Sequence, residues 1–152
     1  MTPVALLPEI RDRAAADPVR TRLAAGGAAL LVVGAGLGLR AVATGSVAKY
    51  GGDALYTVLL LCLVVLVAPR LSPLRAAGSA LAVSCIVEFL QLSSVPADLS
   101  RRSTLARLVL GSTFNPPDLF WYSVGAASGW LLHTAVRSLR ARPARLRAAA
   151  RT

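Results

Sequence analysis

Nine polar residues in this largely apolar sequence are of types that hold protons, bind anions or accept hydrogen bonds. Glu88 and Gln91 lie within the run "CIVEFLQL" at 85–92, and Asp53 and Asp118 lie at the edges of two other apolar runs. The spacing i, i+3 places Glu88 and Gln91 on one face of a helix. The complete set of candidate site residues is Arg40, Lys49, Asp53, Tyr56, Glu88, Gln91, Arg102, Asp118 and Tyr122.

The residue types define what this set can do. Glu88 and Asp118 are candidates for an acid, a base or a hydrogen-bond acceptor, and the cations are candidates for holding anionic groups. His133 is the only histidine, and the two cysteines, Cys62 and Cys85, lie inside apolar runs without metal-ligand spacing. We therefore expect no metal and no cofactor, and the residues leave open whether any reaction is catalysed.

The apolar runs that surround these residues indicate a membrane protein. Of the 152 residues, 55% are hydrophobic and only 16% are charged, which is too apolar for an ordinary soluble domain of this length. A helical span needs about 20 apolar residues. Four spans are predicted, at 23–39, 54–69, 76–94 and 119–136.

The distribution of basic residues predicts how these spans are oriented. With four spans, twelve arginines fall on one side of the membrane and only five basic residues on the other. The positive-inside rule then places both termini in the cytoplasm. The basic residues also predict contact with anionic lipid headgroups. Nucleic acid is not expected as a partner, because no aromatic residues alternate with the arginines of the C-terminal region.

Three regions follow from this topology. Residues 1–22 are expected to form a cytoplasmic N-terminal arm at the interface, residues 23–136 the membrane domain, and residues 137–152 a basic cytoplasmic tail. Cleavage of the first span as a secretory signal, after the small residues at 41–43, is the less favoured alternative, because acidic residues precede the span.

The connections between spans carry further predictions. The segments at 40–53 and 69–75 are predicted to be short loops, whereas the long connection at 96–117 contains an apolar stretch too short to span. We expect this stretch to form a short interfacial or re-entrant helix, capped by Ser103 or Thr104. Two pairs of glycines spaced four apart, Gly34/Gly38 and Gly125/Gly129, are typical of close helix packing, and we expect them to pair the first and fourth spans or to bind a membrane-protein partner.

In this topology the candidate residues gather at the outer ends of the spans. Glu88 is the deepest, and a charge facing lipid there would be costly, so it is expected to face the bundle. It should either hold a proton or pair with a cation, of which Arg102 is favoured over Arg40 and Lys49. Three interpretations remain open. The cluster is a buried ion-pair network that fixes helix packing, a pocket for a ligand, or part of an ion path.

Four ordered segments carry a resemblance to known families. The segments "KYGGDALYTVLLL" at 49–61, "CIVEFLQL" at 85–92, "LARLVLGSTF" at 105–114 and "PDLFWYSVGAASGW" at 117–130 resemble a family of small bacterial membrane proteins known as domain of unknown function 2809. The pattern Glu88-x-x-Gln91 followed by Asp118-x-x-x-Tyr122 is also similar to the VanZ-like family. This second resemblance implies a role in low-level resistance to the glycopeptide teicoplanin.

Taken together, the sequence predicts an all-α, integral membrane four-helix bundle with a short interfacial or re-entrant segment between the third and fourth spans. The expected location is the bacterial inner membrane. The expected function is binding of a lipid-linked or anionic cell-envelope ligand at an outward-facing polar site. The alternative is an assembly or regulatory subunit whose charge cluster only stabilises the bundle.

Overall fold

The computed structural model describes residues 17–111 and 113–149, and every regular element in these ranges is a helix. Most of the expected N-terminal arm lies outside the described residues. The helices, in chain order, are α2 (Pro18–Val42), α3 (Gly45–Val67), α4 (Pro73–Leu90), α5 (Val95–Arg102), α6 (Thr104–Leu110) and α7 (Pro116–Ala149).

Local sequence signals fix where several helices begin. The Asp17 carboxylate accepts a hydrogen bond from the Val19 N–H at 3.0 Å, and Ser72 Oγ accepts from the Arg75 N–H at 3.4 Å. These bonds satisfy N–H groups that have no partner within the helix. Each capping residue is followed directly by a proline, whose fixed φ suits the first helical position. The starts of α2 and α4 are therefore set by local chemistry.

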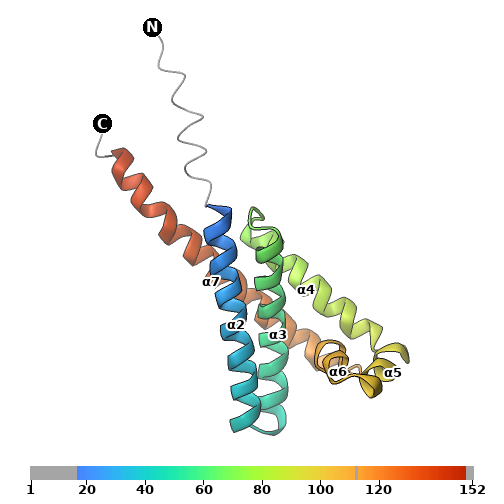
Figure 1. The fold of residues 1–152 in the computed structure, drawn as a ribbon. Helices are drawn as coiled ribbons and strands as arrows, with labels where there is room; N and C mark the ends of the chain where they lie inside the picture. The colour runs from blue at the N-terminus through green and yellow to red at the C-terminus, as the bar shows by residue number, and fades with distance from the viewer. Residues whose placement is uncertain (1–16, 112, 150–152) are drawn as a thin grey trace.

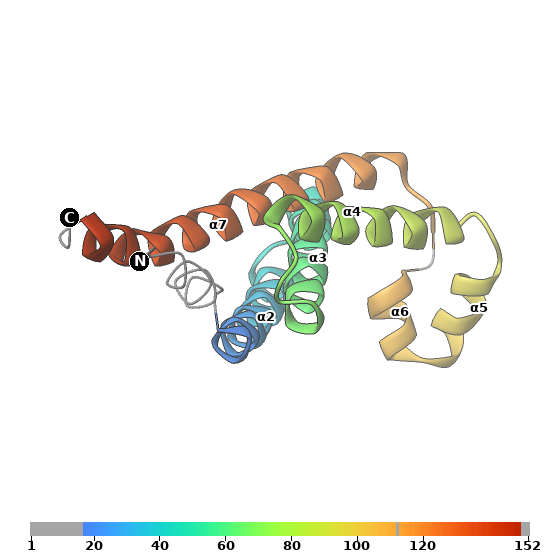
Figure 2. The ribbon, with the colours of Figure 1, turned by 90° about the horizontal axis from the view of Figure 1, so that it is seen from above.

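The helices form two antiparallel pairs that cross each other obliquely. α2 and α3 run side by side, and α4 and α7 form the second pair (Figures 1 and 2). α3 packs against α2, α4 and α7 and is the central helix. α2 begins and α7 ends at the same end of the molecule, and α5 and α6 lie at the opposite end (Figure 1).

Three helices, α2, α3 and α4, are long and apolar enough to cross a membrane. At 1.5 Å per residue they measure about 38, 35 and 27 Å, against about 30 Å for a bilayer core. Large apolar side chains such as Leu30, Leu31 and Leu37 point outward from α2, as a lipid environment requires. The all-helical class is thus confirmed, and three of the four predicted spans are helices that could cross a membrane by length and composition. α7 is helical over the fourth, but Tyr122, Ser123 and His133 make that stretch less apolar.

The predicted loop at 40–53 is wrong. α3 begins at Gly45, so only residues 43 and 44 link it to α2. A Cβ placed on Gly51 would lie 2.6 Å from Leu39 Cδ2, which shows that α2 packs closely against this glycine. Gly51 thus belongs to a helix surface against which α2 packs, and Gly52 follows it within the same helix.

The two glycine pairs do not face each other. A Cβ on Gly125 would overlap the Ala54 carbonyl, and one on Gly129 would lie 2.8 Å from Leu61 Cδ1, so this pair packs on α3. No atom lies within 4 Å of such a Cβ at Gly34 or Gly38. The predicted pairing of the first and fourth spans through these glycines is therefore wrong, because α3 occupies the position next to α7.

The hydrophobic core lies between α3, α4 and α2 and is built on small side chains. Ala76 and Ala80 are fully buried, and Leu61 and Val65 pack against them. Alanine lets the helix backbones approach closely, which is the usual basis of helix association in membranes. α4 is thereby held against α3, with Glu88 at its far end.

Candidate functional site

Glu88 lies in the last turn of α4 and is completely buried. Its Oε1 accepts a hydrogen bond from the Asn115 N–H at 2.6 Å, and its Oε2 accepts one from the Tyr122 hydroxyl at 2.9 Å. Asn115 directly precedes α7, and Tyr122 belongs to it. A buried carboxylate is costly unless its oxygens are hydrogen-bonded. Glu88 therefore attaches the end of α4 to the start of α7.

Asp118, in the first turn of α7, is held by a second set of contacts. The Lys49 ammonium donates to Asp118 Oδ2 at 2.6 Å and also contacts Oδ1, and the Asn115 side-chain amide donates to Oδ1. The same ammonium lies 3.5 Å from Asp53 Oδ2, one helical turn along α3. Asn115 thus bridges Glu88 through its backbone and Asp118 through its side chain.

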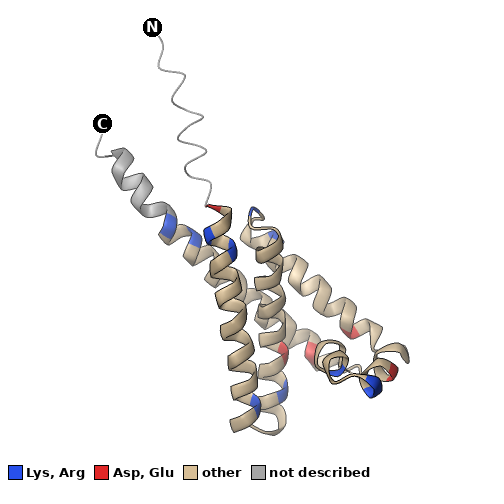
Figure 3. Cartoon of the chain, in the orientation of Figure 1, with Lys and Arg blue, Asp and Glu red and all other residues tan. Residues whose placement is uncertain are grey.

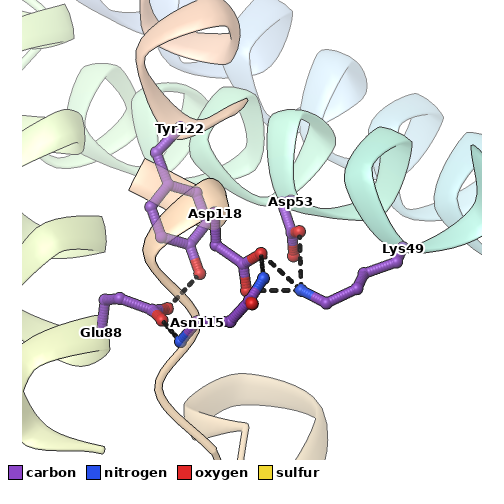
Figure 4. Close-up of polar contacts among 6 residues, drawn as sticks. All are labelled: Lys49, Asp53, Glu88, Asn115, Asp118 and Tyr122. Carbon is purple, nitrogen blue, oxygen red and sulfur yellow. Dashed lines mark hydrogen bonds and ion pairs between the residues drawn. The ribbon is translucent and has the colours of Figure 1, made fainter. Parts of the chain in front are cut away.

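The six residues form one continuous network, called here the polar cluster (Figure 4): Lys49, Asp53, Glu88, Asn115, Asp118 and Tyr122. Its burial is graded. Glu88 is 0% exposed, whereas the side chains of Asp118, Asp53 and Lys49 are 7%, 21% and 46% exposed. The cluster is therefore closed to solvent at Glu88. Lys49 and Asp53 form its solvent-exposed side, called here the open edge.

Aromatic rings frame the polar cluster. The Tyr56 and Tyr122 rings are tilted with centroids 6.2 Å apart, and Tyr50 stacks on Trp121 with centroids 5.5 Å apart. The Lys49 ammonium lies 5.4 Å from the centroid of the Tyr50 ring, within the range of a cation–π contact. The open edge thus combines a cation, a carboxylate and a stacked pair of rings.

The connection from α4 to α7 closes one side of the cluster. Gln91 Nε2 donates to the Leu110 carbonyl at 2.6 Å, and Ser100 Oγ donates to the Gly111 carbonyl at 2.6 Å. Gly111 has a φ of +64°, a conformation suited to glycine, and a Cβ there would lie 2.5 Å from Gln91 Nε2. The segment predicted to be interfacial or re-entrant contains two short helices, α5 and α6, and Ser103 caps α6 by accepting from the Ala106 N–H, as expected.

Seven of the nine candidate residues lie in or beside the cluster. Lys49, Asp53, Glu88, Asp118 and Tyr122 are members, Tyr56 contacts the Tyr122 ring, and Gln91 ties down the loop. Arg40 and Arg102 are exposed and make no hydrogen bond or ion pair with any other described residue. The predicted pairing of Glu88 with Arg102 is wrong, because neutral donors of the α7 segment reach both carboxylate oxygens first.

Three residues in or near the cluster are not predicted from the sequence. Asn115 stands before two prolines, which mark a break in the chain, and it donates to both Glu88 and Asp118. Thr57 and Ser84 are fully buried and lie 2.9 Å apart between α3 and α4. Ser84 donates to the Ala80 carbonyl at 3.1 Å, so the Thr57 hydroxyl is the donor to Ser84. The signal available for Ser84 is a serine within the apolar run at 76–94, where its hydroxyl can bond the carbonyl four residues earlier.

The charges are distributed unevenly along the molecule. Figure 3 shows arginines at the end where α2 begins, together with one acidic residue, the α2 cap Asp17. The other acidic residues of the described chain lie in the opposite half, which also carries basic residues. Within the cluster itself, three carboxylates accompany one ammonium. No three His, Cys, Asp or Glu residues in the described part of the chain are grouped so as to hold a metal ion.

Comparison with known proteins gives one match. A family model described as "Protein of unknown function (DUF2809)" matches residues 42–126, more than half of the chain. This range contains α3 to α6 and the start of α7, and with them every member of the polar cluster. No curated protein and no solved structure shows significant similarity to the chain.

Proposed function

The chain belongs to the DUF2809 family, and we propose that it is a four-span membrane protein whose open cluster edge binds the headgroup of a lipid-linked cell-envelope ligand. α7 is the fourth span, because its residues 119–136 carry no Asp, Glu, Lys or Arg and pack on α3 and α4. The arginine-rich end faces the cytoplasm by the positive-inside rule. The polar cluster then faces the outer surface of a bacterial inner membrane.

The graded burial of the cluster is the observation that carries this proposal. If the cluster served only to join helices, its charges would be expected to be enclosed to a similar degree, as Glu88 and Asp118 are. Instead, Lys49 is 46% exposed while the carboxylates that hold it are largely covered. The Lys49 ammonium is held by two carboxylates at the open edge, so it is positioned to bind a polar group of a ligand.

The residues at the edge favour a hydroxyl-rich headgroup. Asp53 retains acceptor capacity for sugar hydroxyls, and Lys49 has three N–H donors that suit a phosphate oxygen. The stacked Tyr50 and Trp121 rings offer a flat apolar surface of the kind that packs against a sugar ring. A purely anionic ligand is less suited, since three carboxylates lie near the single ammonium. Arg40, near the end of α2, is the cation available to a longer diphosphate.

A binding measurement tests this proposal. Full-length protein in detergent is titrated with a polyprenyl diphosphate-linked disaccharide, and with the same lipid lacking the sugar. Loss of one hydrogen bond to a charged acceptor corresponds to about ten- to hundredfold in affinity. Asp53→Asn should weaken binding of the sugar-bearing lipid by that factor and leave binding of the plain lipid nearly unchanged. Equal binding of both lipids by the original protein would overturn the proposal.

The second candidate function is an assembly or regulatory subunit whose cluster only fastens the helices. The specific observation in its favour is that Glu88 and Asp118 already have protein donors for all four carboxylate oxygens. Under this alternative, Asp53→Asn has no effect on either lipid. The VanZ-like resemblance adds a cellular test: on the ligand-binding proposal, Asp53→Asn should remove any teicoplanin phenotype while protein abundance remains unchanged.

A further inference from the structure

The opposite end of the molecule carries a hollow that the polar cluster does not involve. It has a volume of about 390 Å³ and lies between the start of α2 and the turn that joins α3 to α4. Its lining includes Pro18 and Arg22 from α2 and Ala68, Arg70 and Leu71 from the turn. Two of these side chains carry a positive charge, so the hollow is a candidate for an anionic group.

Arg22, which lines the hollow, and Arg137, which contacts the lining residue Leu71, are held in place by backbone oxygens. Arg22 Nε donates to the Leu66 carbonyl at 3.1 Å, and its Nη2 donates to the Val67 carbonyl at 3.5 Å. Arg137 Nη1, from α7, donates to the carbonyl of Leu71 at 3.0 Å. A guanidinium has five N–H donors, so each retains donors for another acceptor. Their positions are fixed before any ligand binds, which lowers the entropic cost of binding.

The surroundings of the hollow are strongly basic. Arg20, Arg75 and Arg140 belong to the adjoining turns of α2, α4 and α7. Among the described residues of this region the one carboxylate is Asp17, which accepts from the Val19 N–H and lies 3.8 Å from Arg20 Nε. The excess of positive charge favours an anion such as a phosphate diester.

An apolar groove continues directly from the hollow. It lies between α3 and α4, has a volume of about 380 Å³, and is lined by residues such as Leu63, Ser79 and Val83. Val67 and Ala68 line both the hollow and the groove. A basic hollow at the end of the α3–α4 pair therefore continues into an open, mainly apolar groove. The basic hollow suits the charged headgroup of a phospholipid, and the apolar groove suits an acyl chain.

We propose that this combined surface is a binding site for one anionic glycerophospholipid. Its phosphate lies in the hollow against Arg22 and Arg70, and one acyl chain lies along the groove between α3 and α4. Basic pockets between membrane helices on the cytoplasmic side are suited to such headgroups. This site is separate from the polar cluster and does not depend on the function proposed for that cluster.

Lipid binding to full-length protein in detergent, followed by native mass spectrometry, tests the site. Phosphatidylglycerol should bind more tightly than phosphatidylcholine with the same acyl chains. Arg70→Gln should reduce that preference about fivefold, the value of one cation near a lipid surface. Arg70 makes no hydrogen bond or ion pair with another described residue, so its replacement leaves the fold intact. Arg107→Gln, on α6 at the other end, is the matched control.

Two further arms identify the source of the phosphate. Ser79→Phe places a ring in the groove and should weaken binding of both lipids, because the ring occupies the space proposed for the acyl chain. Phosphatidylglycerol should stabilise the protein in detergent against thermal unfolding, and inorganic phosphate alone should not. The proposal is overturned if Arg70→Gln behaves like Arg107→Gln, if the two lipids bind equally, or if inorganic phosphate stabilises as well as the lipid and Ser79→Phe has no effect.

Discussion

The Tyr122 hydroxyl donates to Glu88 Oε2 across 2.9 Å and joins α7 to α4 at a fully buried carboxylate. The bond connects residues 34 positions apart, so it fixes the start of α7 against the end of α4. Because the Glu88 oxygen is enclosed, it has no access to water if this donor is lost.

Tyr122→Phe should therefore reduce stability. It leaves a buried acceptor without its partner, and the expected loss is about 1–3 kcal/mol in the free energy of unfolding. The measurement is thermal or denaturant unfolding of the purified protein in detergent. Tyr50→Phe is the control, since the Tyr50 hydroxyl makes no hydrogen bond within the described residues. Equal melting of the two variants would show that the Glu88 contact contributes nothing.

The close crossing of α3 and α7 gives a second prediction. Gly125→Ala would drive a methyl group into the Ala54 backbone, whose Cα would lie 3.1 Å from the new Cβ. Backbone atoms cannot move aside as a flexible side chain can, so overpacking should cost about 1–3 kcal/mol. Gly36→Ala on α2 has open space around it and should be neutral or stabilising. Unfolding of both variants under one condition decides between them; a tolerated Gly125→Ala contradicts the crossing.

Thr57→Val should weaken the packing of α3 on α4. The substitution conserves shape but removes the donor to Ser84 Oγ in a fully buried contact. Hydrogen bonds between membrane helices contribute about 0.6–2 kcal/mol, and we expect a loss in this range. Thr134→Val, at an exposed position of α7, is the control. Stability equal to that of the control would show that the Thr57 hydroxyl is dispensable.

Topology is tested by labelling with a membrane-impermeant maleimide in intact cells. After the two native cysteines are replaced, Asp98→Cys on α5 should react from outside, and Ser72→Cys in the α3–α4 turn should react only after permeabilisation. The expectation follows from the arginine-rich end being cytoplasmic. Protection of Asp98→Cys together with labelling of Ser72→Cys would reverse the orientation.

The apolar runs predicted the helices because hydrocarbon content alone decides whether a segment can cross a bilayer. The sequence also predicted that Glu88 faces the bundle, since lipid would penalise it. It failed where tertiary packing decides the outcome. The segment at 40–53 suggests a loop, but it is helical from Gly45, and Leu39 packs against Gly51. The sequence favours a cation as the partner of Glu88, whereas a backbone N–H and a phenol satisfy it.

Asn115 is another residue whose contacts the local sequence does not predict. Its neighbours Pro116 and Pro117 indicate a helix start, and they are the start of α7. Nothing in that local pattern shows that the Asn115 amide contacts Asp118 while its N–H contacts Glu88. Such a bridge exists only once α4 and α7 lie side by side, which depends on contacts between residues distant in sequence.

The proposed binding of a lipid-linked sugar at Lys49 and Asp53 is tested most directly by a structure of the full-length protein with the polyprenyl diphosphate-linked disaccharide bound. We expect density for a sugar at the open edge, with a hydroxyl within about 2.7 Å of an Asp53 carboxylate oxygen and the ring against Tyr50 and Trp121. Density for the ligand elsewhere, with Lys49 and Asp53 unoccupied at saturating ligand, would contradict it.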